Sequence, residues 1–197
     1  MDYFAGMRAV LSVPFLVSIY CWFALEIGLV VRDLVRRKAR LRRDRGTRAI
    51  VAFSLGGAIF IGVLLRRWIP ALDTPAADAF AAAGLVLIWA GLVVRVWAVI
   101  ALGRSFSTFV QVSVGQTVVT TGPYRWVRHP SYTGLLLIAT GFGLGAGNWL
   151  SMVICVVGPL LGLVPRIAVE ESELTRVLGE QYRSYQEKTY RLLPRVW

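Results

Sequence analysis

The sequence has very little of the chemistry that metal sites, disulfide frameworks and hydrolases use. It contains one histidine, His129, and two cysteines, Cys21 and Cys155, which lie inside apolar runs and lack the spacing of zinc ligands. Neither a Gly-x-Ser-x-Gly elbow nor a His-Glu-x-x-His pair occurs. We therefore expect no metal site and no disulfide framework, and hydrolysis is poorly supported.

Charged residues are nearly absent from several long runs, although the chain has 22 Lys and Arg residues. Residues 9–31 carry a single charge, Glu26, residues 49–65 carry none, and residues 79–94 carry none before Arg95 interrupts the run. Each run approaches or exceeds the roughly 17 residues that a membrane-spanning helix needs. With 56% hydrophobic residues overall, the chain is predicted to be an all-α polytopic membrane protein.

The longest uncharged stretch, residues 132–165, is too long for one span. As a single helix its 34 residues would extend about 51 Å, against a hydrocarbon core of about 30 Å. Two helices of about 16 residues, joined near Gly147-Asn148-Trp149, would each extend about 24 Å and form a short C-terminal hairpin. The chain is therefore expected to have about five transmembrane helices.

Acidic residues are scarce, 11 against 22 basic ones, and the basic residues are unevenly placed. Residues 32–48 hold nine of them, residues 95–131 hold four, and the tail from Arg166 holds six. By the positive-inside rule these three segments face the cytoplasm and the N-terminus faces outward. Confinement of the charge to segments beside the spans favours contact with anionic membrane lipids over nucleic acid.

No repeat and no linker divides the chain, so residues 1–197 are expected to form one membrane domain. Three N-terminal spans occupy residues 1–100, and residues 101–197 form the half expected to carry function. Residues 105–121 are interpreted as an extended connector, with a surface loop or ribbon as the alternative, because β-branched residues and Gly115 break a helix there. Residues 166–181 are expected to form a separate amphipathic helix on the cytoplasmic side.

Four glycines alternate along the first arm of the expected hairpin: Gly141, Gly143, Gly145 and Gly147. The run does not match a nucleotide-binding loop, because it follows no strand and lacks the Gly-x-Gly-x-x-Gly spacing. Its pairs at a spacing of four residues are typical of helices that approach closely in a membrane. We therefore expect these glycines to lie at a helix interface.

The only histidine lies in a polar, turn-forming segment, Gly122–Gly134, at the mouth of an apolar run. Pro130 follows His129 directly, which removes one backbone donor and disfavours the helical region for the histidine. A ligand there can be approached from water and from hydrocarbon. The segment is therefore a candidate site for chemistry on a lipid-like substrate.

Arg166 and Glu170 are four residues apart and share a helix face where the tail begins. They could pair with each other as a surface ion pair or receive a zwitterionic ligand. Glu171 is expected to point elsewhere.

The segments G-P-Y-R-W-V-R-H-P-S-Y-T-G, E-E and G-E-Q-Y-R-S-Y-Q-E-K-T-Y-R-L-L-P together resemble the isoprenylcysteine carboxyl methyltransferase family, over roughly residues 104–194. The resemblance implies S-adenosylmethionine as cofactor, a prenylcysteine or similar lipophilic acid as substrate, and catalytic roles for Arg166 and Glu170. It implies that Arg166 binds the substrate carboxylate. The residues implied around the cofactor are Gln111, Gln116, Thr117, Val118, Val119, Tyr124, Arg128, His129, Pro130, Ser131 and Glu170.

The residues are compatible with methyl transfer to a carboxylate, which is ionised at neutral pH and needs no general base. The protein has only to align the reacting atoms and exclude water. Three alternatives remain at this point: N-methylation of a phospholipid amine, reduction of a lipid by NADPH, and a membrane scaffold without enzymatic activity. An arginine aimed at a carboxylate favours the carboxyl acceptor.

Overall fold

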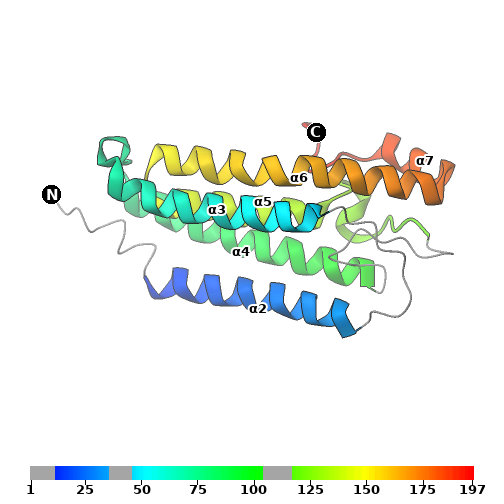
Figure 1. Cartoon of the computed structure of the whole chain (residues 1–197), viewed down its shortest axis with the longest axis horizontal. Helices are drawn as coiled ribbons and strands as arrows, with labels where there is room; N and C mark the ends of the chain where they lie inside the picture. The colour runs from blue at the N-terminus through cyan, green and yellow to red at the C-terminus, as the bar shows by residue number, and fades with distance from the viewer. Residues whose placement is uncertain (1–11, 36–45, 104–116) are drawn as a thin grey trace.

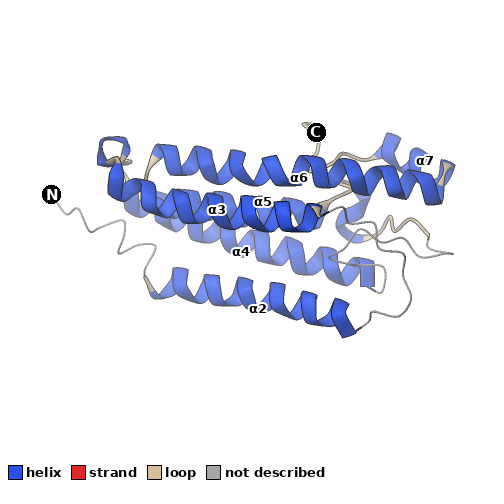
Figure 2. Cartoon of the chain, in the orientation of Figure 1, coloured by secondary structure: helices blue, strands red, loops and turns tan. Residues whose placement is uncertain are grey.

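A computed structural model of the chain describes residues 12–35, 46–103 and 117–197. These ranges are almost entirely helical, and no strand occurs within them (Figure 2). The helices, with two 3-10 turns named η, are α2 (Val13–Val35), α3 (Thr47–Trp68), η1 (Pro70–Leu72), α4 (Ala77–Leu102), η3 (Gly122–Arg125), α5 (Pro130–Ala146), α6 (Trp149–Leu178) and α7 (Glu180–Lys188).

The five long helices lie along one axis, and each runs opposite to the one before it (Figure 1). The end of α2, the start of α3, the end of α4 and the start of α5 therefore meet at one end of the bundle. The second half of α6 extends past that end and carries α7. The three segments expected to be basic and cytoplasmic begin or end there.

Within the described ranges, four helices are long and apolar enough to cross a membrane: α2, α3, α4 and α6. The expected fifth span, α5, has 17 residues and lies alongside them. The prediction of an all-helical polytopic membrane protein is confirmed. The count differs from the expected five only because α5 is shorter than the other four.

Glycines bring α4 and α5 into close contact. A Cβ added at Gly84 would lie 2.5 Å from the carbonyl oxygen of Gly141, and one added at Gly134 would lie 2.7 Å from that of Gly91. Such distances are too short for any side chain, so the two backbones meet directly. Gly145 faces α2, where an added Cβ would overlap the ring of Phe15. The expectation that this glycine run packs helices is confirmed for Gly141, Gly143, which faces α6, and Gly145, whereas Gly147 ends α5.

The hairpin turns where the sequence predicted. Gly147 ends α5 in the left-handed region, at φ 65°, a conformation that glycine adopts without strain. Asn148 then caps α6, because its side-chain oxygen accepts from the backbone N–H groups of Leu150 at 3.1 Å and Ser151 at 3.3 Å. Its amide nitrogen donates to the Ile69 carbonyl at 3.0 Å, which ties this turn to the loop between α3 and α4.

The Asn148→Ala variant is expected to unfold at a lower temperature than the wild type in detergent. Loss of the cap alone costs about 0.5–2 kcal/mol, and the Ile69 carbonyl also loses its Asn148 donor. Asn148→Ser keeps a capping oxygen and should recover part of the loss. Equal melting temperatures for the wild type and Asn148→Ala would contradict this assignment.

The prediction of a second short arm followed by a separate tail helix is wrong. Instead, α6 continues without a break through Pro159 and Pro165 to Leu178, a length of 30 residues or about 45 Å. Membrane helices tolerate proline because neighbouring helices and local adjustment satisfy the freed carbonyl groups. The residues expected at the start of a new helix, Arg166 and Glu170, therefore lie in the middle of α6.

The expectation that Arg95 interrupts the third apolar run is also wrong. Arg95 lies inside α4 with a buried side chain, and the helix continues to Leu102. Its charge is matched by Glu26 of α2, with 2.6 Å between Arg95 Nε and Glu26 Oε1. A charge inside an apolar helix is tolerated when a neighbouring helix supplies its counter-charge, which the run of residues 79–94 could not reveal.

Candidate active site

The histidine segment, Gly122–Gly134, consists of the 3-10 turn η3, a short link and the first turn of α5, and it lies at the end of the bundle. Gly122, at φ 60°, starts η3, and Pro130 starts α5. The C-terminal tail pairs with the residues between them: Arg128 N–H donates to the Tyr190 carbonyl at 2.7 Å, and His129 N–H donates to the Arg191 carbonyl at 3.0 Å. The tail thereby fixes the backbone on which the histidine sits.

Glu171 is the centre of a buried charged cluster. Its Oε1 accepts from Arg128 Nε at 2.8 Å, and His129 Nε2 lies 3.1 Å from the same oxygen. Its Oε2 accepts from Arg191 Nε at 3.1 Å. Because a carboxylate only accepts, His129 contributes the proton in its contact. One carboxylate of α6 thus joins the histidine segment to the tail.

The prediction that Glu171 points elsewhere is wrong, and sequence reasoning missed this residue. Glu171 is about 100° around the helix from Glu170, on the face that α7 and the tail cover. Its side chain is only 7% exposed. The adjacent Glu-Glu pair was the available signal, but nothing in its local spacing shows that the tail folds back over it.

A second chain of contacts joins Arg166 to Glu170. Arg166 Nε donates to the Tyr132 hydroxyl at 3.1 Å, and that hydroxyl donates to Glu170 Oε2 at 2.7 Å. Arg166 Nη1 donates to Thr47 Oγ1 at 2.8 Å, so the start of α3 also holds the guanidinium. The two residues share one face of α6 as the spacing predicted, but Tyr132 stands between them. The alternative of an exposed surface pair is excluded for Arg166, whose residue is 3% exposed.

The imidazole of His129 connects the two groups of contacts. Its ring stacks on the ring of Tyr132, with centroids 5.5 Å apart and planes inclined by 12°. Its Nε2 reaches Glu171, while Tyr132 reaches Glu170 and Arg166. His129 and Glu170 therefore lie at the same end of the bundle and belong to one connected network.

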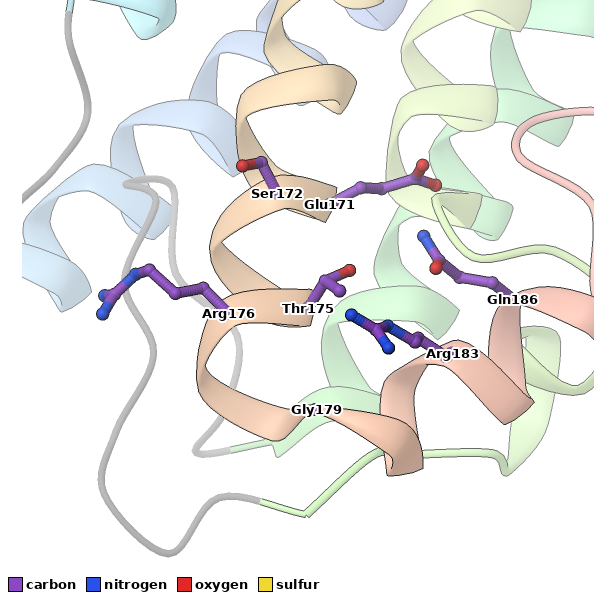
Figure 3. A pocket seen from close by; sticks show the side chains of 7 residues that line it. All are labelled: Glu171, Ser172, Thr175, Arg176, Gly179, Arg183 and Gln186. Atoms are coloured by element: carbon purple, nitrogen blue, oxygen red, sulfur yellow. The ribbon is translucent and has the colours of Figure 1, made fainter.

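A hollow of about 610 Å³ adjoins this network between the last turns of α6 and α7. Figure 3 shows Glu171 and Gln186 pointing toward one another across it, while Arg176 points away. The lining residues are Glu171, Ser172, Thr175, Arg176, Gly179, Arg183 and Gln186. All but one of these residues, Gly179, have polar or charged side chains, and the hollow lies beside Glu171, where a polar ligand could reach the buried cluster from water.

Tyrosines of α7 hold the histidine segment in place without supplying a base. Tyr185 donates its hydroxyl proton to the Tyr124 carbonyl at 2.7 Å. Burial raises the pKa of Tyr185 to about 12, with the nearby Arg128 charge acting in the opposite direction. Burial also raises the pKa of Tyr124. Both phenols therefore stay protonated at neutral pH.

The structure brings together most of the residues expected around a cofactor. Tyr124 lies in η3, Arg128 and His129 lie in the link that follows it, and Pro130 and Ser131 begin α5, close to Glu170. Thr117, Val118 and Val119 lie in the segment before η3, which has neither helix nor strand. Gln111 and Gln116 lie outside the described residues, as does most of the expected extended connector.

The charges of the network around His129, Glu170 and Glu171 suit a negatively charged substrate. Its charged side chains are three arginines, Arg128, Arg166 and Arg191, and two carboxylates, Glu170 and Glu171. These five groups leave one net positive charge at neutral pH. A guanidinium fixed from two sides can orient a carboxylate through parallel hydrogen bonds.

A family model matches the part of the chain that contains the histidine segment and both glutamates. Residues 83–176 match the isoprenylcysteine carboxyl methyltransferase (ICMT) family model. The expected resemblance to the ICMT family is confirmed. The matched region begins in α4 and ends in α6, so it includes Arg95, the histidine segment, Arg166 and both glutamates. Both Glu26 and Thr47 lie before it, and Arg191 lies after it.

Curated ICMT proteins are similar over the same part of the chain. Protein-S-isoprenylcysteine O-methyltransferase A of Arabidopsis thaliana is 35% identical over 115 residues, which cover 57% of this chain and 58% of the relative. The Xenopus laevis protein-S-isoprenylcysteine O-methyltransferase is 35% identical over 117 residues, which cover 56% of this chain and 39% of the relative. The chain thus spans less than two thirds of the length of these relatives.

One solved ICMT structure is also similar in fold. It is described as the eukaryotic intramembrane Ras methyltransferase ICMT, and it superposes with a TM-score of 0.57 at 30% sequence identity. The superposition covers 75% of this chain and 52% of the solved one. The similarity therefore extends beyond the residues that the family model matches.

Proposed function

We propose that this chain is an integral-membrane methyltransferase that transfers the methyl group of S-adenosylmethionine to the carboxylate of a prenylated cysteine or a similar lipophilic acid. In this proposal the site faces the cytoplasm, and residues 101–197 form the cofactor-binding and catalytic half of a single membrane domain. The names of the ICMT relatives and the family match over residues 83–176 support the reaction class.

The observation that carries the proposal is the position of Arg166. Its guanidinium is buried, is held by Tyr132 and Thr47, and lies one helical turn from Glu170 at the polar end of a membrane bundle. A lipophilic acid reaching this depth through the bilayer would lose its hydration and gain a fixed cationic partner. That arrangement favours an acid over a phospholipid amine, which would be repelled by the net positive charge.

The residues of the network fit S-adenosylmethionine, which carries a sulfonium and an ammonium group. Tyr132 uses Glu170 Oε2, and no described side chain donates to Oε1, which is therefore available for a cationic donor. The stacked rings of His129 and Tyr132 offer an aromatic face for a cation. When bound, this cofactor supplies an electrophilic methyl group on sulfur.

The remaining work of the site is orientation and exclusion of water. A carboxylate acceptor is already ionised at neutral pH, so no side chain has to remove a proton. Arg166 holds the acceptor oxygen in place, and hydrogen bonds with the tail and α7 fix the backbone of the histidine segment. Fixing two reactants in this way can supply a large part of a rate enhancement.

A two-step experiment on the purified protein tests the proposal. Calorimetry should detect S-adenosylmethionine binding, and a radiolabelled methyl group should then pass to an S-prenylated cysteine acid as a base-labile ester. The matched acceptors are the carboxamide of the same compound and phosphatidylethanolamine, which should stay unlabelled. Absence of binding at millimolar cofactor would refute the proposal, and base-stable label on the phospholipid would replace the acceptor with an amine.

Glu170→Gln and His129→Ala are expected to weaken cofactor binding directly. Loss of a hydrogen bond to a charged group is worth about 1.5–3 kcal/mol, or roughly a tenfold to hundredfold rise in Kd. The control is Glu180→Gln, because Glu180 is exposed and pairs only with Arg183 among the described residues. Unchanged Kd values for both variants would remove these residues from the cofactor site.

A further inference from the structure

An ion pair lies inside the bundle, apart from the residues already assigned to the site. Arg95 of α4 is 4% exposed, and its Nη2 donates to Glu26 Oε2 of α2 at 2.7 Å. Its Nε lies 2.6 Å from Glu26 Oε1, an ion-pair contact without the alignment of a hydrogen bond. Trp22 Nε1 donates to the same oxygen at 3.2 Å. The carboxylate of Glu26 is thus fixed from two sides.

The third nitrogen of Arg95 points toward the histidine segment. Nη1 donates to Ser131 Oγ at 2.7 Å and to the Ser131 carbonyl at 3.2 Å. Ser131 is the second residue of α5 and is two residues from His129. One guanidinium therefore connects α2, α4 and the beginning of α5.

Fold stability alone is a weak reason for such a pair. Ionisable side chains within membrane spans are costly, and those that persist mark functional positions. Replacing a buried ion pair with apolar residues of similar size is often neutral or even stabilising. The contacts of Nη1 with Ser131 are the part that apolar residues could not reproduce.

We propose that Glu26 and Arg95 are positioning residues that set the start of α5 for cofactor binding. Glu26 orients the guanidinium, and Arg95 fixes the backbone and the hydroxyl of Ser131, which holds His129 and Tyr132 at their stacking distance. Neither residue contacts the substrate in this inference. It rests on the proposed function, and it gives the N-terminal span α2 a part in a site formed by the other helices.

The double variant Glu26→Leu/Arg95→Met separates positioning from stability. It removes both charges together, so its melting temperature in detergent should stay close to that of the wild type, whereas Arg95→Met alone should melt lower. Despite its stability, the double variant should bind S-adenosylmethionine at least tenfold more weakly. The control is Asp78→Asn, an exposed charge removal in the first turn of the same helix, which should leave the Kd unchanged.

If the double variant does not fold, Glu26→Gln tests the same positioning role. It keeps the size of the side chain and an accepting oxygen but removes the charge, and the Kd for the cofactor should rise about threefold to tenfold. Wild-type Kd and kcat in a folded double variant, or in Glu26→Gln, would show that the pair only supports the fold. Failure of the wild type to bind the cofactor would instead refute the proposed function, so the two failures are distinguishable.

Discussion

Arg166→Ala is expected to lower kcat/KM for the lipophilic acid by about 100- to 1,000-fold while leaving the Kd for S-adenosylmethionine nearly unchanged. This range corresponds to about 3–4 kcal/mol of transition-state stabilisation. The physical reason is that the only buried guanidinium facing Tyr132 and Thr47 within the described residues is removed, and the acid loses its orienting partner. Steady-state kinetics with a prenylcysteine acid and calorimetry with the cofactor measure the two effects.

The control for Arg166→Ala is Arg166→Lys, which keeps the charge but not the planar fork. It should recover binding of the acid, seen in KM, more than kcat, because a point charge attracts a carboxylate without fixing its plane. Thr47→Val should shift KM in the same direction by a smaller amount. If Arg166→Ala abolished cofactor binding and spared the acid, the assignments of Arg166 and Glu170 would be reversed.

Glu171→Ala is expected to cause the largest loss of stability of any single substitution considered. It leaves Arg128, His129 and Arg191 without their shared acceptor in a buried position. Removal of one partner from a buried ion pair typically costs about 3–5 kcal/mol. Thermal unfolding in detergent should show a much lower melting temperature for Glu171→Ala than for the wild type. Glu171→Gln keeps one accepting oxygen, so its melting temperature should lie between those of the wild type and Glu171→Ala.

The control is Glu180→Gln in the first turn of α7. Glu180 pairs with Arg183, and both side chains are mostly exposed. Solvent-exposed pairs of this kind contribute between zero and about 1 kcal/mol, so the melting temperature should barely change. Similar losses from Glu171→Ala and Glu180→Gln would contradict the view that Glu171 joins the tail to the histidine segment.

Hydropathy and charge predicted the main features of the fold because both act locally along the chain. Uncharged runs located the helices, and Gly147 with Asn148 located the hairpin turn, since one residue ends a helix and the other caps the next. The same local rules failed at Pro165, where neighbouring helices allow α6 to continue. They failed at Arg95 for a similar reason, because its counter-charge is 69 residues away in the sequence.

The candidate site was predictable where its residues are neighbours in the sequence. The spacing of Arg166 and Glu170 placed both on one helix face, and Pro130 marked the start of α5. The cluster around Glu171 was not predictable, because its burial depends on the tail folding back along residues 126–129. When a distant segment folds back in this way, it leaves no periodic pattern in the sequence. The functional roles assigned to the site residues stay predictions.

The continuity of α6 has a mechanical consequence for the protein in different lipids. Arg166, Glu170 and Glu171 are carried by one unbroken rod that is anchored at its far end by the Asn148 turn. Their mutual spacing is therefore insensitive to the host bilayer, but the height of the whole set above the midplane is not. Thicker membranes should draw the guanidinium deeper into hydrocarbon, so that acyl-chain length tunes how readily a buried acid meets it.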